Sequence, residues 1–175
     1  MNEPVMSYTA PEQGQRMRAE APHSILSVSH ALPVQEELCC HTVQTPRRAL
    51  TERYISTVFR RIHGAKITQF MPILLSLGAA KANKAAVGMR RASSGPLFIE
   101  SYLEAPIEDA LTDLGVDVRT RHEIVEIGNL ASTRSGYSQI LFILLTSLMK
   151  LAGIKTVTFC GTKEVVGLMQ KLGMQ

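Results

Sequence analysis

The fold is decided by one stretch of the chain, His122-Glu-Ile-Val-Glu-Ile-Gly-Asn-Leu-Ala-Ser-Thr-Arg-Ser-Gly-Tyr-Ser138. Its first half predicts a β-strand over Glu123–Leu130, and its second half predicts a tight turn that contains a glycine. An apolar helix at Gln139–Ala152 and a β-branched strand at Ile154–Cys160 follow. A strand–turn–helix–strand order points backbone N–H groups of the turn at a phosphate. We therefore expect the functional site at the turn Thr133–Ser138.

Further elements are predicted on both sides of this stretch. Thr45 is expected to be the N-cap and Pro46 the first residue of a helix that ends at Gly64, with its arginines on a solvated face. The other expected elements are a strand at Glu37–Gln44, a hairpin of Met71–Leu77 and Ala85–Arg90, a short strand at Leu97–Glu100, and helices at Ser101–Leu114 and Lys163–Leu172. Pro106 suits the first turn of the helix Ser101–Leu114, so the alternative for Ser101–Ala105 is a loop. Because helices alternate with strands, the fold class is α/β (α+β), a mixed central sheet with helices on both faces.

The composition is that of a globular protein. The chain has 175 residues, of which 45% are hydrophobic, and a formal net charge of +4. The acidic residues are interspersed among the basic ones, so no basic tract indicates a nucleic-acid partner. Residues 1–22 are rich in Glu, Gln, Arg, Pro and Ala, and we expect a disordered tail there. Residues 23–175 are expected to form a single domain.

The cysteines and the apolar runs indicate a cytoplasmic protein. Three cysteines do not make a disulfide framework. The N-terminus lacks a secretory signal, and the longest apolar run, Ile140–Ala152, is shorter than the ~20 residues of a membrane span. Cys39-Cys40-His41 lacks a second pair of residues at ligand spacing, so we predict no metal site.

Three strings of residues carry a resemblance to a known family. They are Met-Pro-Ile-Leu-Leu at 71–75, Gly-Pro-Leu-Phe-Ile-Glu-Ser-Tyr-Leu-Glu-Ala-Pro-Ile-Glu at 95–108, and Ile-Val-Glu-Ile-Gly-Asn-Leu-Ala-Ser-Thr-Arg at 124–134. In these strings the chain resembles the thermostable haemolysin family from about Thr45 to Met174. That family in turn resembles the GNAT acyltransferase superfamily. Within the superfamily, the order Arg90, Gly95-Pro96, Glu126 is similar to that of acyl-homoserine-lactone synthases.

The resemblance implies a GNAT-like sheet and an activity. Two more strands normally follow the last helix of that fold, so the C-terminal strands are expected to be missing. Ile154–Cys160 would then lie at the sheet edge, where a second copy of the chain could cover it in a homo-oligomer. The implied function is N-acyl transfer from acyl-CoA or acyl carrier protein to a small amine, with no permanently bound cofactor. The alternatives are a membrane-active haemolysin and a degenerate, non-catalytic acyl-CoA-binding module.

Residues of the turn are the candidates for binding the donor. Gly136 allows close approach of the backbone to an anion, and Arg134 adds a cation. Alternatively, Gly136 only shapes the turn between strand and helix. The full donor-binding set is Arg134, Ser135, Gly136, Tyr137 and Ser138.

The acceptor side is assigned to carboxylates and their neighbours. Glu126 lies in an apolar strand, where an unpaired carboxylate is costly. It is therefore either a base that takes up the amine proton or the partner of an arginine such as Arg90 or Arg91. Asn129 is a candidate for orienting the substrate. The expected acceptor pocket contains Arg90, Glu100, Tyr102 and Glu104, and the alternative for these residues is a solvated loop.

Overall fold

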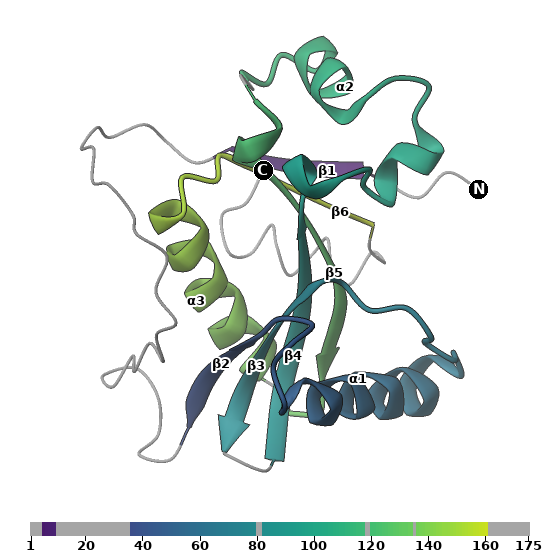
Figure 1. The fold of residues 1–175 in the computed structure, drawn as a ribbon, viewed down its shortest axis with the longest axis vertical. Coiled ribbons are helices and arrows are strands. Elements are labelled where there is room, and N and C mark those ends of the chain that lie inside the picture. The colour runs from purple at the N-terminus through teal and green to yellow at the C-terminus, as the bar shows by residue number, and fades with distance from the viewer. Residues whose placement is uncertain (1–4, 10–35, 80–81, 118–119, 135, 161–175) are drawn as a thin grey trace. The chain divides into compact units, whose positions relative to one another are not determined.

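A computed structural model describes residues 5–9, 36–79, 82–117, 120–134 and 136–160 (Figure 1). Its strands are β1 (Val5–Thr9), β2 (Glu37–His41), β3 (Ile73–Ala79), β4 (Ala82–Arg91), β5 (Ile124–Ser132) and β6 (Thr156–Cys160). Its α-helices are α1 (Arg48–His63), α2 (Ile107–Asp113) and α3 (Tyr137–Leu151). Three short 3₁₀ helices are η1 (Ala92–Ser94), η2 (Ile99–Tyr102) and η3 (Arg121–Glu123).

The sheet is mixed, as the alternation of strands and helices predicts. Its hydrogen-bonded order is β1-β6-β5-β4-β3-β2. β2, β3 and β4 are antiparallel neighbours, whereas β5 and β6 are parallel. The chain divides into two compact units, and the strands are distributed between them. Unit 1 comprises residues 1–22, 90–127 and 143–175, and unit 2 comprises residues 23–89 and 128–142.

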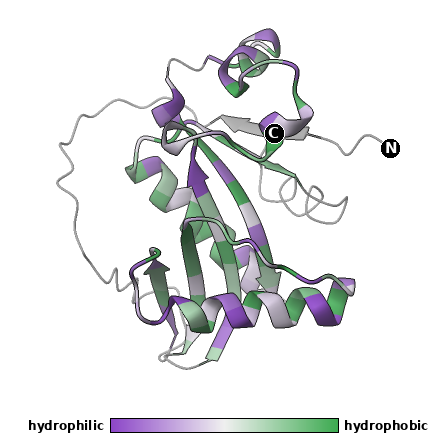
Figure 2. Ribbon diagram, turned by 45° about the vertical axis from the view of Figure 1, so that its right-hand side comes forward, coloured by the Kyte–Doolittle hydropathy of each residue, from purple (hydrophilic) through white to green (hydrophobic). Residues whose placement is uncertain are grey.

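In unit 2, α1 packs its apolar stripe against the sheet. Polar and apolar residues alternate around this helix in the colouring of Figure 2. The buried residues of this core are Ile55, Val58, Leu74, Ala86 and Ala131. The stripe supplies most of the driving force for docking the helix, since each fully buried aliphatic side chain contributes about 1.5–3 kcal/mol.

The C-terminus of α1 lies where the sequence predicts it, but the N-terminus does not. Gly64 ends the helix with a φ of 63°. The helix begins at Arg48, not at Pro46, because the Thr45 hydroxyl accepts the N–H of Thr42 at 3.0 Å. Thr45 therefore closes a turn that precedes the helix, and its prediction as the N-cap was wrong.

One arginine of α1 corrects the prediction of a solvated face. Arg48 is buried, and its guanidinium donates to the carbonyl oxygens of Met71 at 2.7 Å and Pro72 at 2.8 Å. It also pairs with Glu52 at 2.7 Å. Five N–H donors in a planar fork allow one arginine to bind several carbonyl groups at once. Arg48 thus fastens α1 to the segment that leads into β3.

In unit 1, buried polar contacts replace a predicted strand with a helical turn. Leu97–Glu100 was expected to be a strand, but the chain forms η2 at Ile99–Tyr102. Carboxylates accept the N–H groups of Leu97, Phe98 and Ile99, so these groups cannot join a strand ladder. α2 begins only at Ile107, after Pro106. The core of this unit is Ala92, Leu97, Ile99, Ile107, Leu111 and Ile124.

β1 corrects two further expectations. Residues 5–9 were assigned to a disordered tail, but they pair with β6 in antiparallel register from Val5–Cys160 to Thr9–Thr156. β6 is therefore not a bare sheet edge. The remainder of the predicted tail, residues 1–4 and 10–22, and the predicted helix Lys163–Leu172 lie outside the described residues. Within the described part of the chain, none of the helices is both long and apolar enough to span a bilayer.

Candidate functional site

The predicted phosphate-binding turn lies in unit 2, between β5 and α3. Gly136 has a φ of 86°, a conformation that favours glycine. The Thr133 N–H donates to the Lys84 carbonyl at 3.1 Å, which fixes the start of the turn to β4. In the first turn of α3, the Tyr137 N–H donates to the Arg134 carbonyl at 3.4 Å and the Ile140 N–H donates to the Gly136 carbonyl at 3.1 Å. The N–H groups of Ser138 and Gln139 are therefore the candidates for an anion at this helix N-terminus. Ser135 of the predicted donor-binding set lies outside the described residues.

A lysine that the sequence analysis did not single out lies beside this turn. The Lys84 ammonium donates to the Tyr137 hydroxyl at 3.0 Å and lies 5.0 Å from the centre of the Tyr137 ring. It also pairs with the Glu36 carboxylate, to which the Tyr137 hydroxyl donates at 3.1 Å. The hydroxyl of Tyr137, a residue predicted to bind the donor, is therefore hydrogen-bonded within the protein. The Lys84–Glu36 ion pair thus fixes the first residue of α3 to β4.

The carbonyl of Lys84 connects the turn to α1. It accepts the Tyr54 hydroxyl at 2.6 Å in addition to the Thr133 N–H. The Tyr54 hydroxyl also lies 3.3 Å from the Thr133 hydroxyl. Burial is the main cause that raises the pKa of Tyr54, so this phenol stays protonated and able to donate. Helix, strand and turn are thus held by one cluster of hydrogen bonds.

Asn129, the residue predicted to orient a substrate, holds the backbone. It has a φ of 51°, in the left-handed region that asparagine tolerates better than most residues. Its side-chain oxygen accepts the Met71 N–H at 2.8 Å, and its amide nitrogen donates to the Gln69 carbonyl at 3.4 Å. A Cβ at Gly88 would lie 2.7 Å from the Met71 Cβ, so only glycine fits beneath this contact.

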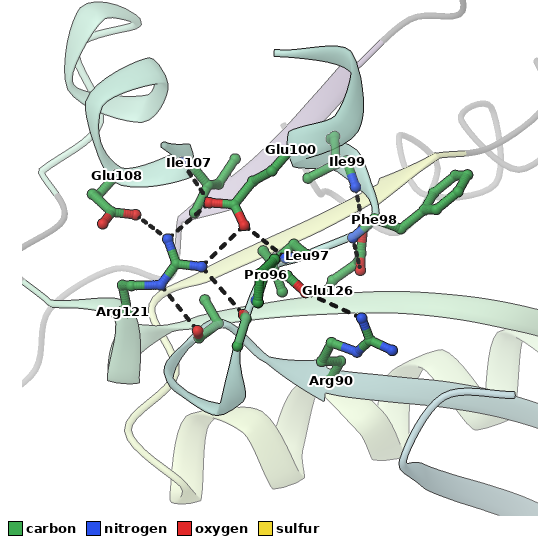
Figure 3. A network of polar contacts seen from close by, with 12 residues as sticks. Arg90, Pro96, Leu97, Phe98, Ile99, Glu100, Ile107, Glu108, Arg121 and Glu126 are labelled. Atoms are coloured by element: carbon green, nitrogen blue, oxygen red, sulfur yellow. Dashed lines mark hydrogen bonds and ion pairs between the residues drawn. The ribbon is translucent and has the colours of Figure 1, made fainter. Parts of the chain in front are cut away.

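Glu126 lies in unit 1 and is one of the most buried side chains, with 1% exposure. Its two carboxylate oxygens accept the N–H of Phe98 at 2.9 Å and the N–H of Ile99 at 2.8 Å, as Figure 3 shows. Arg90, considered from the sequence as its ion-pair partner, donates to the Pro96 carbonyl at 3.1 Å. The buried charge is therefore stabilised by backbone amides, and it holds the start of η2 in place.

A second carboxylate, Glu100, is the centre of an ion-pair network in unit 1 (Figure 3). It accepts two N–H groups of the Arg121 guanidinium, at 2.8 and 3.0 Å, and the backbone N–H groups of Leu97 and Ile107. Arg121 also pairs with Glu108. The hydrogen bonds from Arg121 are the main cause that lowers the pKa of Glu100 from 4.5 to about 2. Glu100 is therefore ionised at neutral pH.

An open cavity of about 540 Å³ lies over this network, entirely within unit 1. Glu100 and Glu104 of the predicted acceptor pocket line it, together with Glu108, Arg121 and Pro96. Tyr102 is 69% exposed and packs its ring edge-on against Phe98, with the ring centres 5.4 Å apart. Three carboxylates against one guanidinium make the lining favourable for a cation.

The described residues contain no cluster of three or more His, Cys, Asp or Glu side chains that could hold a metal ion.

Comparison with known families assigns the chain to one of them. The family model described as "Thermostable hemolysin" matches residues 41–175. The chain belongs to the thermostable hemolysin family. This match covers the strings at 71–75, 95–108 and 124–134 on which the resemblance rested, and it confirms the family expected from them. No curated protein matches the sequence significantly.

A solved structure supports the fold of this thermostable hemolysin family member. The chain is similar to the crystal structure of the AHL synthase LasI, with 14% sequence identity and a TM-score of 0.57. The similarity covers 80% of this chain and 79% of LasI. The expected GNAT-like α/β fold is thereby confirmed.

Proposed function

We propose that this protein is an N-acyltransferase that moves an acyl group from acyl-CoA or acyl carrier protein to a small amine. The observation that carries the proposal is the turn between β5 and α3. It combines a left-handed Gly136, the N-terminus of a fifteen-residue helix and the neighbouring Arg134. The likeness in fold to an AHL synthase supports a thioester donor.

The donor's phosphate would be bound by the turn. The N–H groups of Ser138 and Gln139 in the first turn of α3 would supply hydrogen bonds, and the helix dipole favours an anion there. Gly136 permits close approach because it has no Cβ. The space that a Cβ would fill is open, with the Gln139 side-chain oxygen 4.0 Å away. Arg134 contributes the charge, because the Lys84 ammonium is already paired with the Glu36 carboxylate.

The acceptor would be a small amine, and within unit 1 the carboxylates of the cavity are a separate candidate place for binding a cation. Glu104 is the candidate for contacting it, since Glu100 and Glu108 already pair with Arg121. The amine nitrogen attacks the thioester carbonyl carbon, the C–S bond breaks, and the thiolate leaves with a proton from the amine. Glu126 acts here as a positioning residue, because its two oxygens hold Phe98 and Ile99.

Acyl transfer is tested by mass spectrometry of the purified protein with acyl-CoA of several chain lengths and a panel of small amines. We expect a mass gain of one acyl group on an amine and release of free CoA, both abolished by Gly136→Val. The matched control is Gly64→Val, a glycine of similar φ at the end of α1 in the same unit. Donor binding without transfer would favour the non-catalytic binding module instead.

The haemolysin alternative rests on the family's description. It is tested by adding the purified protein to red cells, and robust lysis at micromolar concentration would contradict the acyltransferase proposal.

A further inference from the structure

A second cavity lies within unit 2, between α1 and the β2–β3–β4 part of the sheet. Its volume is about 290 Å³, which is room for a small molecule or several waters. Small residues of the sheet form part of its lining, among them Cys39, Ser76 and Gly78. A side chain cannot be added at Gly78, because its Cβ would lie 2.3 Å from the Ala82 carbonyl oxygen. The β3–β4 hairpin beside the cavity thus requires a glycine at this position.

The lining contains a buried polar pair. His41 and Ser76 are each only 3% exposed, and the His41 Nε2 lies 3.0 Å from the Ser76 hydroxyl. The other ring nitrogen, Nδ1, has no hydrogen-bond partner among the described residues. A buried polar atom without a partner is costly, and a bound ligand or water is the usual remedy. Burial, followed by the charges of Arg47 and Arg48, lowers the pKa of His41, so the ring is neutral at pH 7.

Two guanidinium groups give the cavity a positive balance. Arg47, the residue before α1, and Arg53, in its second turn, both line it, against the single carboxylate of Glu37. Arg47 is close enough to lower the pKa of Cys39 by its charge, although burial raises that pKa more. Guanidinium groups match the planar oxygens of phosphates and carboxylates.

We propose that this cavity binds a small anion that carries a phosphate or carboxylate group, with Arg47 and Arg53 neutralising its charge and His41 at its inner wall. Tyr54 also lines the cavity, and its hydroxyl lies 3.3 Å from that of Thr133 at the start of the turn. A bound anion would therefore lie next to Tyr54, whose hydroxyl contacts the first residue of the turn Thr133–Ser138. This inference does not rest on the acyltransferase proposal.

Calorimetric titration of the full chain with inorganic phosphate and, separately, with malonate tests the proposal. Arg47→Gln and Arg53→Gln are expected to weaken binding by about tenfold each, because each removes a charge-assisted contact. Arg60→Gln is the matched control, an exposed arginine of α1 that does not line the cavity, and it should bind as the wild type does. Binding of phosphate alone or malonate alone identifies the anion class. Absence of saturable binding of both anions, or equal affinity in all variants, overturns the proposal.

Adjacent cysteines provide a second readout that reports on the cavity itself. Cys39 lines it, whereas Cys40 is the next residue of β2 and is exposed. A saturating anion should slow alkylation of Cys39 by iodoacetamide and leave the rate at Cys40 unchanged, as measured by tandem mass spectrometry. Gly136→Val should keep this protection even if it loses donor binding. Equal rates at Cys39 with and without the anion, or loss of protection in Gly136→Val, would place the anion elsewhere.

Discussion

Replacement of Glu126 by glutamine or alanine tests whether this carboxylate holds η2. Its two hydrogen bonds, 2.9 and 2.8 Å long, come from backbone amides at a site with 1% exposure. A hydrogen bond to a charged group contributes about 1.5–3 kcal/mol, and a buried donor left unpaired costs about 1–3 kcal/mol. Glutamine can accept from one amide only and turns its NH₂ group toward the other. We expect Glu126→Gln to lower the free energy of unfolding by about 2–3 kcal/mol and Glu126→Ala by about 4 kcal/mol.

Urea denaturation followed by circular dichroism measures this loss, read as a lower midpoint at an unchanged slope. Glu123→Gln is the matched control, because Glu123 forms a partly exposed ion pair with Lys155 at 3.1 Å. Such a pair contributes about 0–1 kcal/mol. A Glu126→Gln variant as stable as Glu123→Gln would refute the positioning role. If its stability were kept while acyl transfer was lost, the proton-accepting role would be the better account.

Three further outcomes are expected. Glu100→Gln should lower the free energy of unfolding by about 2 kcal/mol at neutral pH. Because the pKa of Glu100 is lowered to about 2 in the folded protein, the wild type should lose this stability as the pH falls from about 4.5 toward 2. The variant should show a flatter dependence of stability on pH in acid denaturation. Arg134→Ala should weaken donor binding by about 1–3 kcal/mol, and by less in high salt, as calorimetry at two ionic strengths would show. The purified protein should leave red cells intact, as measured by haemoglobin release.

The strand–turn–helix at the centre of the chain could be predicted because its signals are local. β5 spans Ile124–Ser132 and α3 spans Tyr137–Leu151, each within two residues of the predicted limits at either end. The hairpin of β3 and β4 was likewise predicted, although its strands extend further into the turn than expected. In these elements apolar periodicity and glycine positions agree with the tertiary structure.

Features that depend on distant partners could not be predicted. The run Leu97-Phe98-Ile99 reads as a strand, and a carboxylate 27 residues away bends it into η2. β1 contains five residues in a polar surrounding, and its strand conformation depends on pairing with β6. Lys84 and Glu36 meet Tyr137 across 53 and 101 residues of sequence, so no local pattern marks them as part of the site. The role of Arg48 could not be predicted for the same reason, since its carbonyl partners lie 23 and 24 residues away.

Isothermal titration of acyl-CoA into the wild type, Gly136→Val and Gly64→Val tests the central claim most directly. The account predicts one saturable site in the wild type and in Gly64→Val, and no measurable binding in Gly136→Val, because a branched side chain at a φ of 86° reshapes the turn and blocks approach to its N–H groups. Equal binding by Gly136→Val and the wild type, or no binding by the wild type, would contradict it.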